Sequence, residues 1–471
     1  MTPQTADKLK QIQTELIRIT QAWALRQKAD LCRAADLRRQ AALLLHTRYL
    51  AAIPAYARLA QQEGIGPLDD LEPIKTRLMF PDDLFKSYNQ RWLDENAFGR
   101  MNEWLSEIST LRISLDVTGV TSIDEWIGRL EAAGVRLVYS SGTSGNLSFL
   151  PRDASALQLF RTASASYLTP LLLARQASPA WQRRLIGPAI RLLPPETFAW
   201  LTHRIGVKDF DGVFLDFSRG RTGNQTLMRE VAPLFRRHFY LYETDLSPSL
   251  LRLMARGPRT EQDRADLARL HEVVVGQKEA NYSRIAGHIR QSSADGQKLF
   301  IFGTTHQYKE LCDSLAARGE TLAMPAGSLV LFGGGWKSFT GQRISRDELV
   351  SLMAERLGLP PTQILEGYSM TEICAFMLRC EYGRFHLPPL IEPIIFDEEL
   401  LPVSGADLRG IFGFLDPMAT AYPGFLVSGD EVHFVDGDCP CGLTGPAVTE
   451  IGRARAREMK GCGGIMASLS A

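Results

Sequence analysis

The sequence predicts an α/β protein with a mostly parallel sheet, and three observations lead to this fold class. Short apolar runs end in or near glycine at 298–304, 328–335 and 362–370. Segments with the residue pattern of helices, such as 346–358, lie between these runs. Strands that alternate with helices along the chain pair in parallel, and such sheets bind ligands at the carboxyl ends of their strands.

The composition limits the kind of protein. The chain has 471 residues, 45% of them hydrophobic and 23% charged, which suits two or three domains with ample core. Its 53 basic and 53 acidic residues balance, so nothing suggests a nucleic-acid partner. The first residues lack the apolar centre of a signal peptide, and no apolar run is long enough for a membrane span. We therefore expect a cytoplasmic protein whose cysteines are reduced.

Further elements follow from local patterns. Apolar residues recur at helical spacing over 5–60, which predicts helices there. The stretch 64–83 is rich in Gly, Pro and Asp and is predicted to be a loop. An amphipathic helix is expected over 122–134, with Ser122 as its N-cap and Gly134 at its end.

A turn with hydroxyls between glycines follows the strand expected before residue 141. It consists of Ser141, Gly142, Thr143, Ser144 and Gly145. Glycine lets the backbone approach an anion closely, while N–H and O–H groups donate to phosphate oxygens. No Gly-Lys-Ser/Thr follows, so this is not a Walker loop. By itself, a Ser/Gly turn at the surface is an equally good interpretation.

Two further motifs carry groups that suit a nucleotide. Tyr368 offers a face for a base, Thr371 a hydroxyl for phosphate, and Glu372 a hard oxygen ligand for Mg²⁺. Asp430, in Ser428-Gly429-Asp430, is placed to hold ribose hydroxyls. Each motif alone also fits an ordinary turn, with Glu372 as a capping residue.

In this order, the three motifs resemble the adenylate-forming superfamily, which includes acyl-CoA synthetases and nonribosomal adenylation domains. The resemblance spans about residues 135–460 and implies that superfamily's large-domain fold, with ATP and Mg²⁺ as cofactors. It implies these contacts: Thr143 and Ser144 with phosphate, Tyr368 with adenine, Thr371 with the α-phosphate, Glu372 with Mg²⁺, Asp430 with ribose, Gly333, Gly334 and Gly335 with the adenine and acyl pocket, and Arg453 with ribose or phosphate.

The sequence departs from the superfamily pattern in two ways. A lysine usually follows the second glycine of the phosphate loop, but here Asn146 follows it and the nearest base is Arg152. The superfamily also has a further domain of ~100 residues beyond the position of Arg453, and we expect this chain to lack it.

Four segments resemble one branch of the superfamily, the LuxE acyl-protein synthetases of bacterial bioluminescence. They are YSSGTSGNLSFLPRD, FKSYN, FGGGWKS and MKGCGG. The resemblance implies that a long-chain fatty acid is activated with ATP, transferred to a cysteine near the C-terminus, and passed to a reductase partner. Cys462, in Lys460-Gly461-Cys462, matches that cysteine. Basic neighbours would lower the pKa of its thiol, and glycines on both sides would let it move. The alternative is an incidental thiol in a frayed tail.

Four soft ligands raise a separate hypothesis. Cys439 and Cys441 form a short-spaced pair, and Cys380 and His386 follow the nucleotide motif. Three thiolates and one imidazole make a tetrahedral set for zinc. Both segments resemble phenylacetate-CoA ligase-like proteins, in which equivalent residues hold a structural zinc. Because C-x-C is tighter than the usual C-x₂-C spacing, four unliganded side chains stay a nearly equal alternative.

These observations combine into one prediction of organisation and function. We expect a helical N-terminal region at 1–115, an adenylation domain at 116–452, and a flexible tail at 453–471 that carries Cys462. The predicted activity is that of an ATP-dependent acid–thiol ligase, which forms acyl-AMP and moves the acyl group to a protein thiol for a reductase or carrier partner. The alternatives are an acyl- or aryl-CoA or carrier-protein ligase with an idle Cys462, and a catalytically silent nucleotide-binding subunit.

Overall fold

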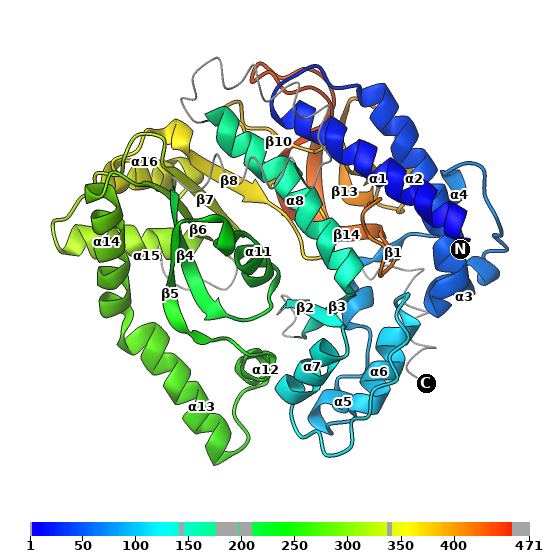
Figure 1. Cartoon of the computed structure of the whole chain (residues 1–471), viewed down its shortest axis with the longest axis horizontal. Coiled ribbons are helices and arrows are strands. Elements are labelled where there is room, and N and C mark those ends of the chain that lie inside the picture. The colour runs from blue at the N-terminus through cyan, green and yellow to red at the C-terminus, as the bar shows by residue number, and fades with distance from the viewer. Residues whose placement is uncertain (1, 141–145, 176–196, 198–209, 337–341, 455–471) are drawn as a thin grey trace.

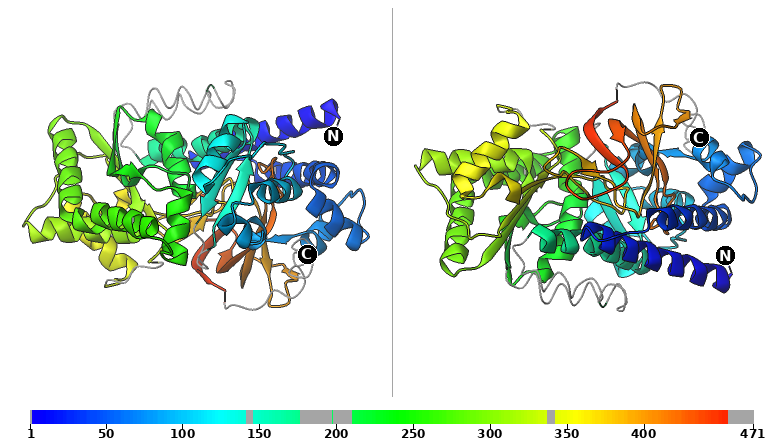
Figure 2. Two further views of the ribbon diagram at one scale, coloured as in Figure 1. Left: turned by 90° about the horizontal axis from the view of Figure 1, so that it is seen from below. Right: turned by 90° about the horizontal axis from the view of Figure 1, so that it is seen from above.

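The computed structural model describes residues 2–140, 146–175, Thr197, 210–336 and 342–454 (Figure 1). Its elements form two large sheets that follow one another along the long axis of the molecule, with the N-terminal helices at the end beyond the second sheet (Figure 2). A small two-stranded sheet lies between them.

The first sheet has six strands in the order β5-β4-β6-β7-β8-β9. Its members are β5 (Arg237–Asp245), β4 (Phe210–Arg219), β6 (Lys298–Thr304), β7 (Leu329–Gly333), β8 (Ile364–Tyr368) and β9 (Met377–Leu378). All neighbours pair in parallel except β8 and β9. This confirms the predicted α/β class and places the carboxyl ends of five parallel strands at one edge.

Helices cover both faces of this sheet because its strands are apolar on both sides. In β6, Leu299 and Ile301 belong to one buried cluster, whereas Phe300 and Phe302 belong to another. Alternate residues of a strand point to opposite faces. The first face is covered by α14 (Lys278–Ala294), α15 (Thr305–Ala317) and α16 (Arg346–Leu357), and the second by α11 (Gly223–Val231) and η2 (Ala232–Leu234).

The second sheet is antiparallel, apart from one short parallel pairing. Its strands are β10 (Phe385–His386), β15 (Ala447–Arg453), β14 (Phe425–Val435), β13 (Asp407–Leu415), β11 (Glu392–Phe396) and β12 (Pro402–Val403), in this order. The short β1 (Phe80–Pro81) pairs in parallel with β14. Mostly parallel pairing therefore describes only the first sheet. The strands of the second sheet follow one another through short turns, which favours antiparallel pairing.

Three N-terminal helices pack against this second sheet. They are α1 (Pro3–Ala24), α2 (Leu31–Ala52) and α3 (Pro54–Gln62), which confirms the helices predicted for this region. One buried cluster joins them to β11, β13 and β14 (Figure 1). In addition, the indole of Trp23 in α1 donates a hydrogen bond at 2.9 Å to the carbonyl of Thr444, which lies between β14 and β15. The division at residues 115 and 452 stays a prediction.

The segment predicted to be a loop contains regular structure instead. It holds α4 (Glu72–Arg77), β1 and the start of η1 (Asp82–Lys86). The prediction was wrong because Pro73 lies in the first turn of α4, where a missing N–H costs nothing. Glu72 at the start and Arg77 at the end of α4 also suit the helix dipole.

A hairpin between the two sheets leads into and out of the predicted phosphate loop. Its strands are β2 (Arg136–Ser140) and β3 (Ser148–Arg152). The preceding α7 (Ile123–Ala132) has Ser122 as its N-cap, as predicted. The remaining elements are α5 (Arg91–Asp94), α6 (Phe98–Glu107), α8 (Ala154–Arg175), α12 (Pro248–Arg256), α13 (Glu261–His271), the π-helix η3 (Glu272–Gly276) and η4 (Pro361–Gln363).

Within the part of the chain that the structure describes, no helix has the length and apolar character needed to cross a bilayer.

Candidate active site

The predicted adenine and ribose residues meet where the carboxyl end of β8 lies against β14. The hydroxyl of Tyr368, the last residue of β8, donates to Oδ2 of Asp430 at 2.6 Å. Arg453 lies opposite Asp430 in the pairing of β14 with β15, and its Nη1 is 3.2 Å from Asp430 Oδ1. The carboxylate thus fixes the tyrosine ring on one side and the arginine on the other. Asp430 lies 62 positions after Tyr368 and 23 positions before Arg453 in the sequence, yet the three residues form one contiguous group.

Thr371 and Glu372 follow Tyr368 in the turn after β8. The first residue of α11, Gly223, lies beside Thr371, because a β-carbon on Gly223 would be only 2.8 Å from Thr371 Oγ1. Any larger residue at this position would have to displace the Thr371 side chain. The amino end of α11 and the Thr371 hydroxyl are therefore neighbours, and both favour an anion.

Glu372 is a buried carboxyl group. Burial and the nearby carboxylate of Asp82 raise the pKa of Glu372 to about 7. A divalent cation would favour the ionised form, since the charge that burial penalises would then have a partner. The residue type and surroundings thus fit the predicted Mg²⁺ ligand.

Asp82 is a member of this group that sequence reasoning missed. Its Oδ2 accepts a hydrogen bond from the backbone N–H of Gly429 at 3.3 Å, one residue before Asp430. Asp82 begins η1, directly after the strand β1 that pairs with β14. No sequence motif marks it. Only the pairing of β1 with β14 brings this acid to the residues predicted for the nucleotide.

The predicted glycines of the adenine and acyl pocket lie at the neighbouring strand end. Gly333 ends β7, and a β-carbon there would lie 2.5 Å from the carbonyl oxygen of Gly367 in β8. Gly334 and Gly335 have φ angles of 81° and 59°, which favour glycine. These residues therefore line the same edge of the parallel sheet as Tyr368.

The predicted phosphate loop and the predicted acyl acceptor lie outside the described residues. This holds for Ser141, Gly142, Thr143, Ser144 and Gly145, and for Cys462. The two ends of the loop are described, and the hydroxyls of Ser140 and Ser148 lie 2.9 Å apart across the hairpin. Their roles stay predictions.

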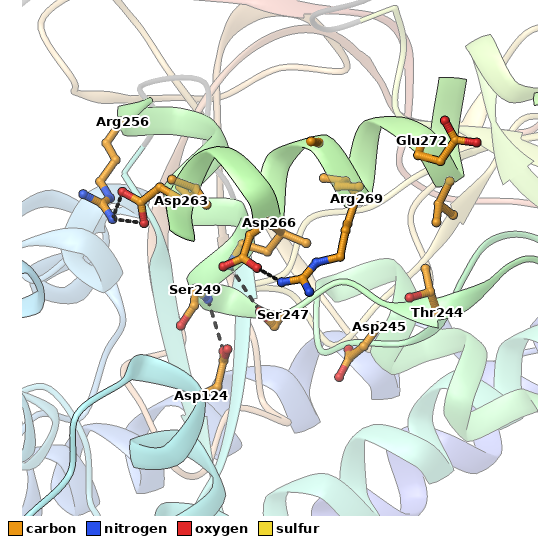
Figure 3. Close-up of a pocket in the computed structure, with 15 residues that line it drawn as sticks. Asp124, Thr244, Asp245, Ser247, Ser249, Arg256, Asp263, Asp266, Arg269 and Glu272 are labelled. Atoms are coloured by element: carbon orange, nitrogen blue, oxygen red, sulfur yellow. Dashed lines mark hydrogen bonds and ion pairs between the residues drawn. The ribbon is translucent and has the colours of Figure 1, made fainter. Parts of the chain in front are cut away.

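A separate cavity of about 860 Å³ lies between α7, the end of β5, α12 and α13 (Figure 3). Five carboxylates and two guanidinium groups line it, and both guanidinium groups are paired, Arg256 with Asp263 and Arg269 with Asp266. The cavity contains none of the residues predicted for ATP. Its excess of carboxylates is unfavourable for a triphosphate.

The four predicted zinc ligands form one compact buried cluster. One ligand atom from each of Cys380, His386, Cys439 and Cys441 lies within 4.8 Å of the others. Two thiols, Cys380 and Cys439, are 3.8 Å apart, and Cys441 Sγ is 3.3 Å from His386 Nε2. Ligands around a tetrahedral zinc with Zn–S bonds of about 2.3 Å are separated by about 3.8 Å between sulfurs. The donor set and its spacing therefore fit zinc.

The electrostatics of this cluster also suit a cation. Burial lowers the pKa of His386 to about 4, so its imidazole is neutral and able to act as a ligand. Burial raises the pKa of the Cys380 and Cys441 thiols, which opposes ionisation unless a cation is bound. Four protein ligands leave no open position, so a zinc ion here would serve folding rather than chemistry.

Zinc analysis tests this prediction. We expect roughly one zinc per chain, and Cys441→Ala should lose the metal and lower the melting temperature, because a three-ligand site binds zinc less tightly. Cys312→Ala is the matched control. It removes another buried thiol, from α15, and should leave the zinc content unchanged. A metal-free preparation as stable and as active as the metal-loaded protein would show that the four side chains are unliganded.

Comparison with known proteins supports the resemblance to the adenylate-forming ligases. Residues 277–469 match the family model described as "Acyl-protein synthetase, LuxE". The chain resembles the LuxE family. This confirms the resemblance that the sequence motifs predicted. The matched range includes Tyr368, Glu372, Asp430 and Cys462, but it begins after the predicted phosphate loop.

Two curated relatives carry the name long-chain-fatty-acid–luciferin-component ligase. The protein from Vibrio harveyi is 26% identical over 192 residues, which cover 40% of this chain and 50% of that protein. The protein from Aliivibrio fischeri is 29% identical over 142 residues, which cover 30% of this chain and 37% of that protein. The chain therefore spans half or less of the length of these LuxE-like relatives.

Solved structures extend the comparison to most of the fold. An open 2-hydroxyisobutyryl-CoA ligase in complex with 2-HIB-AMP and CoA has a TM-score of 0.54 at 13% identity, covering 91% of this chain and 71% of that one. The postadenylation state of a 2-hydroxyisobutyryl-CoA ligase has a TM-score of 0.50 at 12% identity, covering 90% and 69%. At such identities the likeness concerns the fold alone. It confirms the predicted fold of the adenylate-forming ligases.

Proposed function

We propose that this chain activates a carboxylic acid, specifically a fatty acid, with ATP and then takes the acyl group onto Cys462. The observation that carries the proposal is the convergence of Tyr368, Asp430 and Arg453 beside Thr371 and Glu372. This group offers an aromatic face, a ribose acceptor, a hydroxyl and a metal ligand at the carboxyl edge of a parallel sheet. The match to the LuxE family model and the names of the curated relatives support a fatty acid as the substrate.

In the first step, a carboxylate oxygen of the acid attacks the α-phosphorus of ATP. The new P–O bond gives acyl-AMP, and the bond to the bridging oxygen breaks to release pyrophosphate. Tyr368 holds adenine, Asp430 accepts from the ribose hydroxyls, and Thr371 donates to the α-phosphate. A Mg²⁺ ion held by Glu372 would neutralise charge on the phosphates. Residues held in place before the reaction stabilise developing charge without rearrangement.

In the second step, the Cys462 thiolate attacks the acyl carbonyl and AMP leaves with the bonding electron pair. The product is a thioester on the protein, ready for a thiol or a reductase partner. A free cysteine is already a strong nucleophile at neutral pH, and three basic residues, Arg455, Arg457 and Lys460, precede Cys462 in the sequence.

Isotope exchange and mass spectrometry test the proposal. Wild-type protein with Mg²⁺ and a panel of acids should exchange labelled pyrophosphate into ATP with long-chain acids, and its intact mass should rise by one acyl group. Exchange without a protein adduct, but with acyl-CoA formed when CoA is added, would favour the CoA-ligase alternative. No exchange with any acid would indicate a catalytically silent subunit.

Two variants of Tyr368 separate its ring from its hydroxyl. Tyr368→Ala should weaken ATP binding by roughly 1–3 kcal/mol, the range for stacking of a base on an aromatic ring. Tyr368→Phe keeps the ring and loses only the hydrogen bond to Asp430. It should bind ATP more tightly than the alanine variant, as measured by calorimetry. Equal binding by the wild type and both variants would place adenine elsewhere.

A further inference from the structure

Arg152 is an unusual residue beneath the candidate active site. It is the last residue of β3, the strand that leaves the predicted phosphate loop, and only 2% of its surface is exposed. Its guanidinium group lies over the ring of Phe160, with Cζ 4.2 Å from the ring centroid. A positive charge is therefore held in the interior, next to the turn that carries Thr371 and Glu372.

This charge forms no close ion pair, but it interacts electrostatically with the buried carboxyl groups of Asp416 and Glu372. Among the described residues, no carboxylate forms an ion pair with Arg152, and its Nε has no hydrogen-bond partner. By contrast, the similarly buried Arg252 pairs with Asp94 at 2.9 Å. Burial of a charge without a close ion pair is costly, even where carboxyl groups lie nearby. Packing alone does not account for a guanidinium at this position.

The contacts of Arg152 are directed at the backbone of the turn. Its Nη2 lies 3.4 Å from the carbonyl oxygen of Thr371 and 3.4 Å from the hydroxyl of Tyr422. The same Tyr422 hydroxyl donates to the carbonyl of Glu372 at 3.2 Å. The backbone N–H of Cys374 donates to Asp416 at 2.7 Å. Buried side chains from two separate segments, the end of β3 and the turn between β13 and β14, thus fix the backbone at residues 371, 372 and 374.

We propose that Arg152 is a positioning residue for adenylation, which sets the Thr371–Glu372 turn and supplies a fixed positive charge behind it. The inference rests on the proposed function. A charge in the low-dielectric interior acts over a longer distance than in water, so it would stabilise negative charge that develops at the α-phosphate.

Kinetics of two Arg152 variants test this role. Arg152→Met should lower kcat for pyrophosphate exchange by about 30-fold, with little change in KM for ATP, because small displacements of reacting groups cost rate while adenine and ribose contacts persist. Arg152→Lys keeps the positive charge but loses the guanidinium contacts with the Thr371 carbonyl and the Tyr422 hydroxyl. Its kcat should therefore fall between those of the wild type and the methionine variant.

Arg252→Met is the matched control. It removes another buried guanidinium group, but one that contacts Gln90 and Asp94 rather than the Thr371–Glu372 turn. It should lower the melting temperature and leave kcat near the wild-type value. A folded Arg152→Met with wild-type kcat, or a loss seen only as a higher KM, would overturn the proposal. If the methionine variant does not fold, wild-type kcat in Arg152→Lys would overturn it. Wild-type protein without exchange would overturn the proposed function itself, and this inference with it.

Discussion

Replacement of Glu372 by Gln should reduce pyrophosphate exchange by at least about 100-fold, equivalent to roughly 2.7 kcal/mol of transition-state stabilisation. The amide is nearly the same size as the carboxyl group but is neutral, and Mg²⁺ prefers anionic oxygen. Since burial already disfavours a charge at this position, the neutral variant should fold at least as stably as the wild type. Exchange assays and thermal melting on the same preparation measure both effects.

Glu366→Gln is the matched control for this substitution. Glu366 lies on the same strand, β8, and its carboxylate pairs with Arg346 at 2.8 Å on the helix α16. This variant should retain most of the exchange activity. If Glu372→Gln exchanges as fast as Glu366→Gln, the metal is held elsewhere and the nucleotide site is wrongly assigned.

Cys462→Ala should separate the two half-reactions. In the proposed mechanism, adenylation would use the residues around Tyr368 and Asp430 and need no thiol, so pyrophosphate exchange should persist near the wild-type rate. Transfer of labelled acyl groups to the protein should disappear, because the nucleophile is lost. Hydroxylamine should release the label from the wild type, as it does from thioesters.

Two other variants show whether the effect belongs to this cysteine. Cys462→Ser should accept acyl groups far more slowly, because a hydroxyl is scarcely ionised at neutral pH. Cys32→Ala removes an exposed thiol from α2 and should be labelled like the wild type. Labelling of Cys462→Ala as strong as that of the wild type would make Cys462 an incidental thiol, and the CoA-ligase alternative would become the better one.

Local sequence was sufficient to predict three of the six strands of the first sheet, β6, β7 and β8, but not β4, β5 or β9. The run 298–304 is β6, and Ser122 caps α7, because apolar period and capping chemistry act within a few residues. The prediction of a loop at 64–83 was wrong, because the effect of a proline depends on its place in a helix. The same Pro that breaks a helix in its interior is tolerated in its first turn, and α4 begins there.

Candidate residues for the nucleotide and the metal could be proposed from the sequence, because the order of their motifs resembles that of the adenylate-forming superfamily. Sequence motifs predict Tyr368, Glu372 and Asp430 as nucleotide-site residues. The thiol side chains of Cys380 and Cys439 predict them as zinc ligands. What the sequence by itself determined was therefore which groups are chemically able to bind a nucleotide or a metal. It could not determine which other groups surround them.

Only the tertiary structure decided that Asp82 and Arg152 belong to the same site. Asp82 reaches Gly429 because β1 pairs with β14, a contact across 347 residues of sequence. Arg152 reaches the carbonyl of Thr371 across 219 residues. The physical reason is that strand pairing and burial of apolar faces bring distant segments together. An isolated Asp or Arg carries no local signal of the neighbours that give it a role.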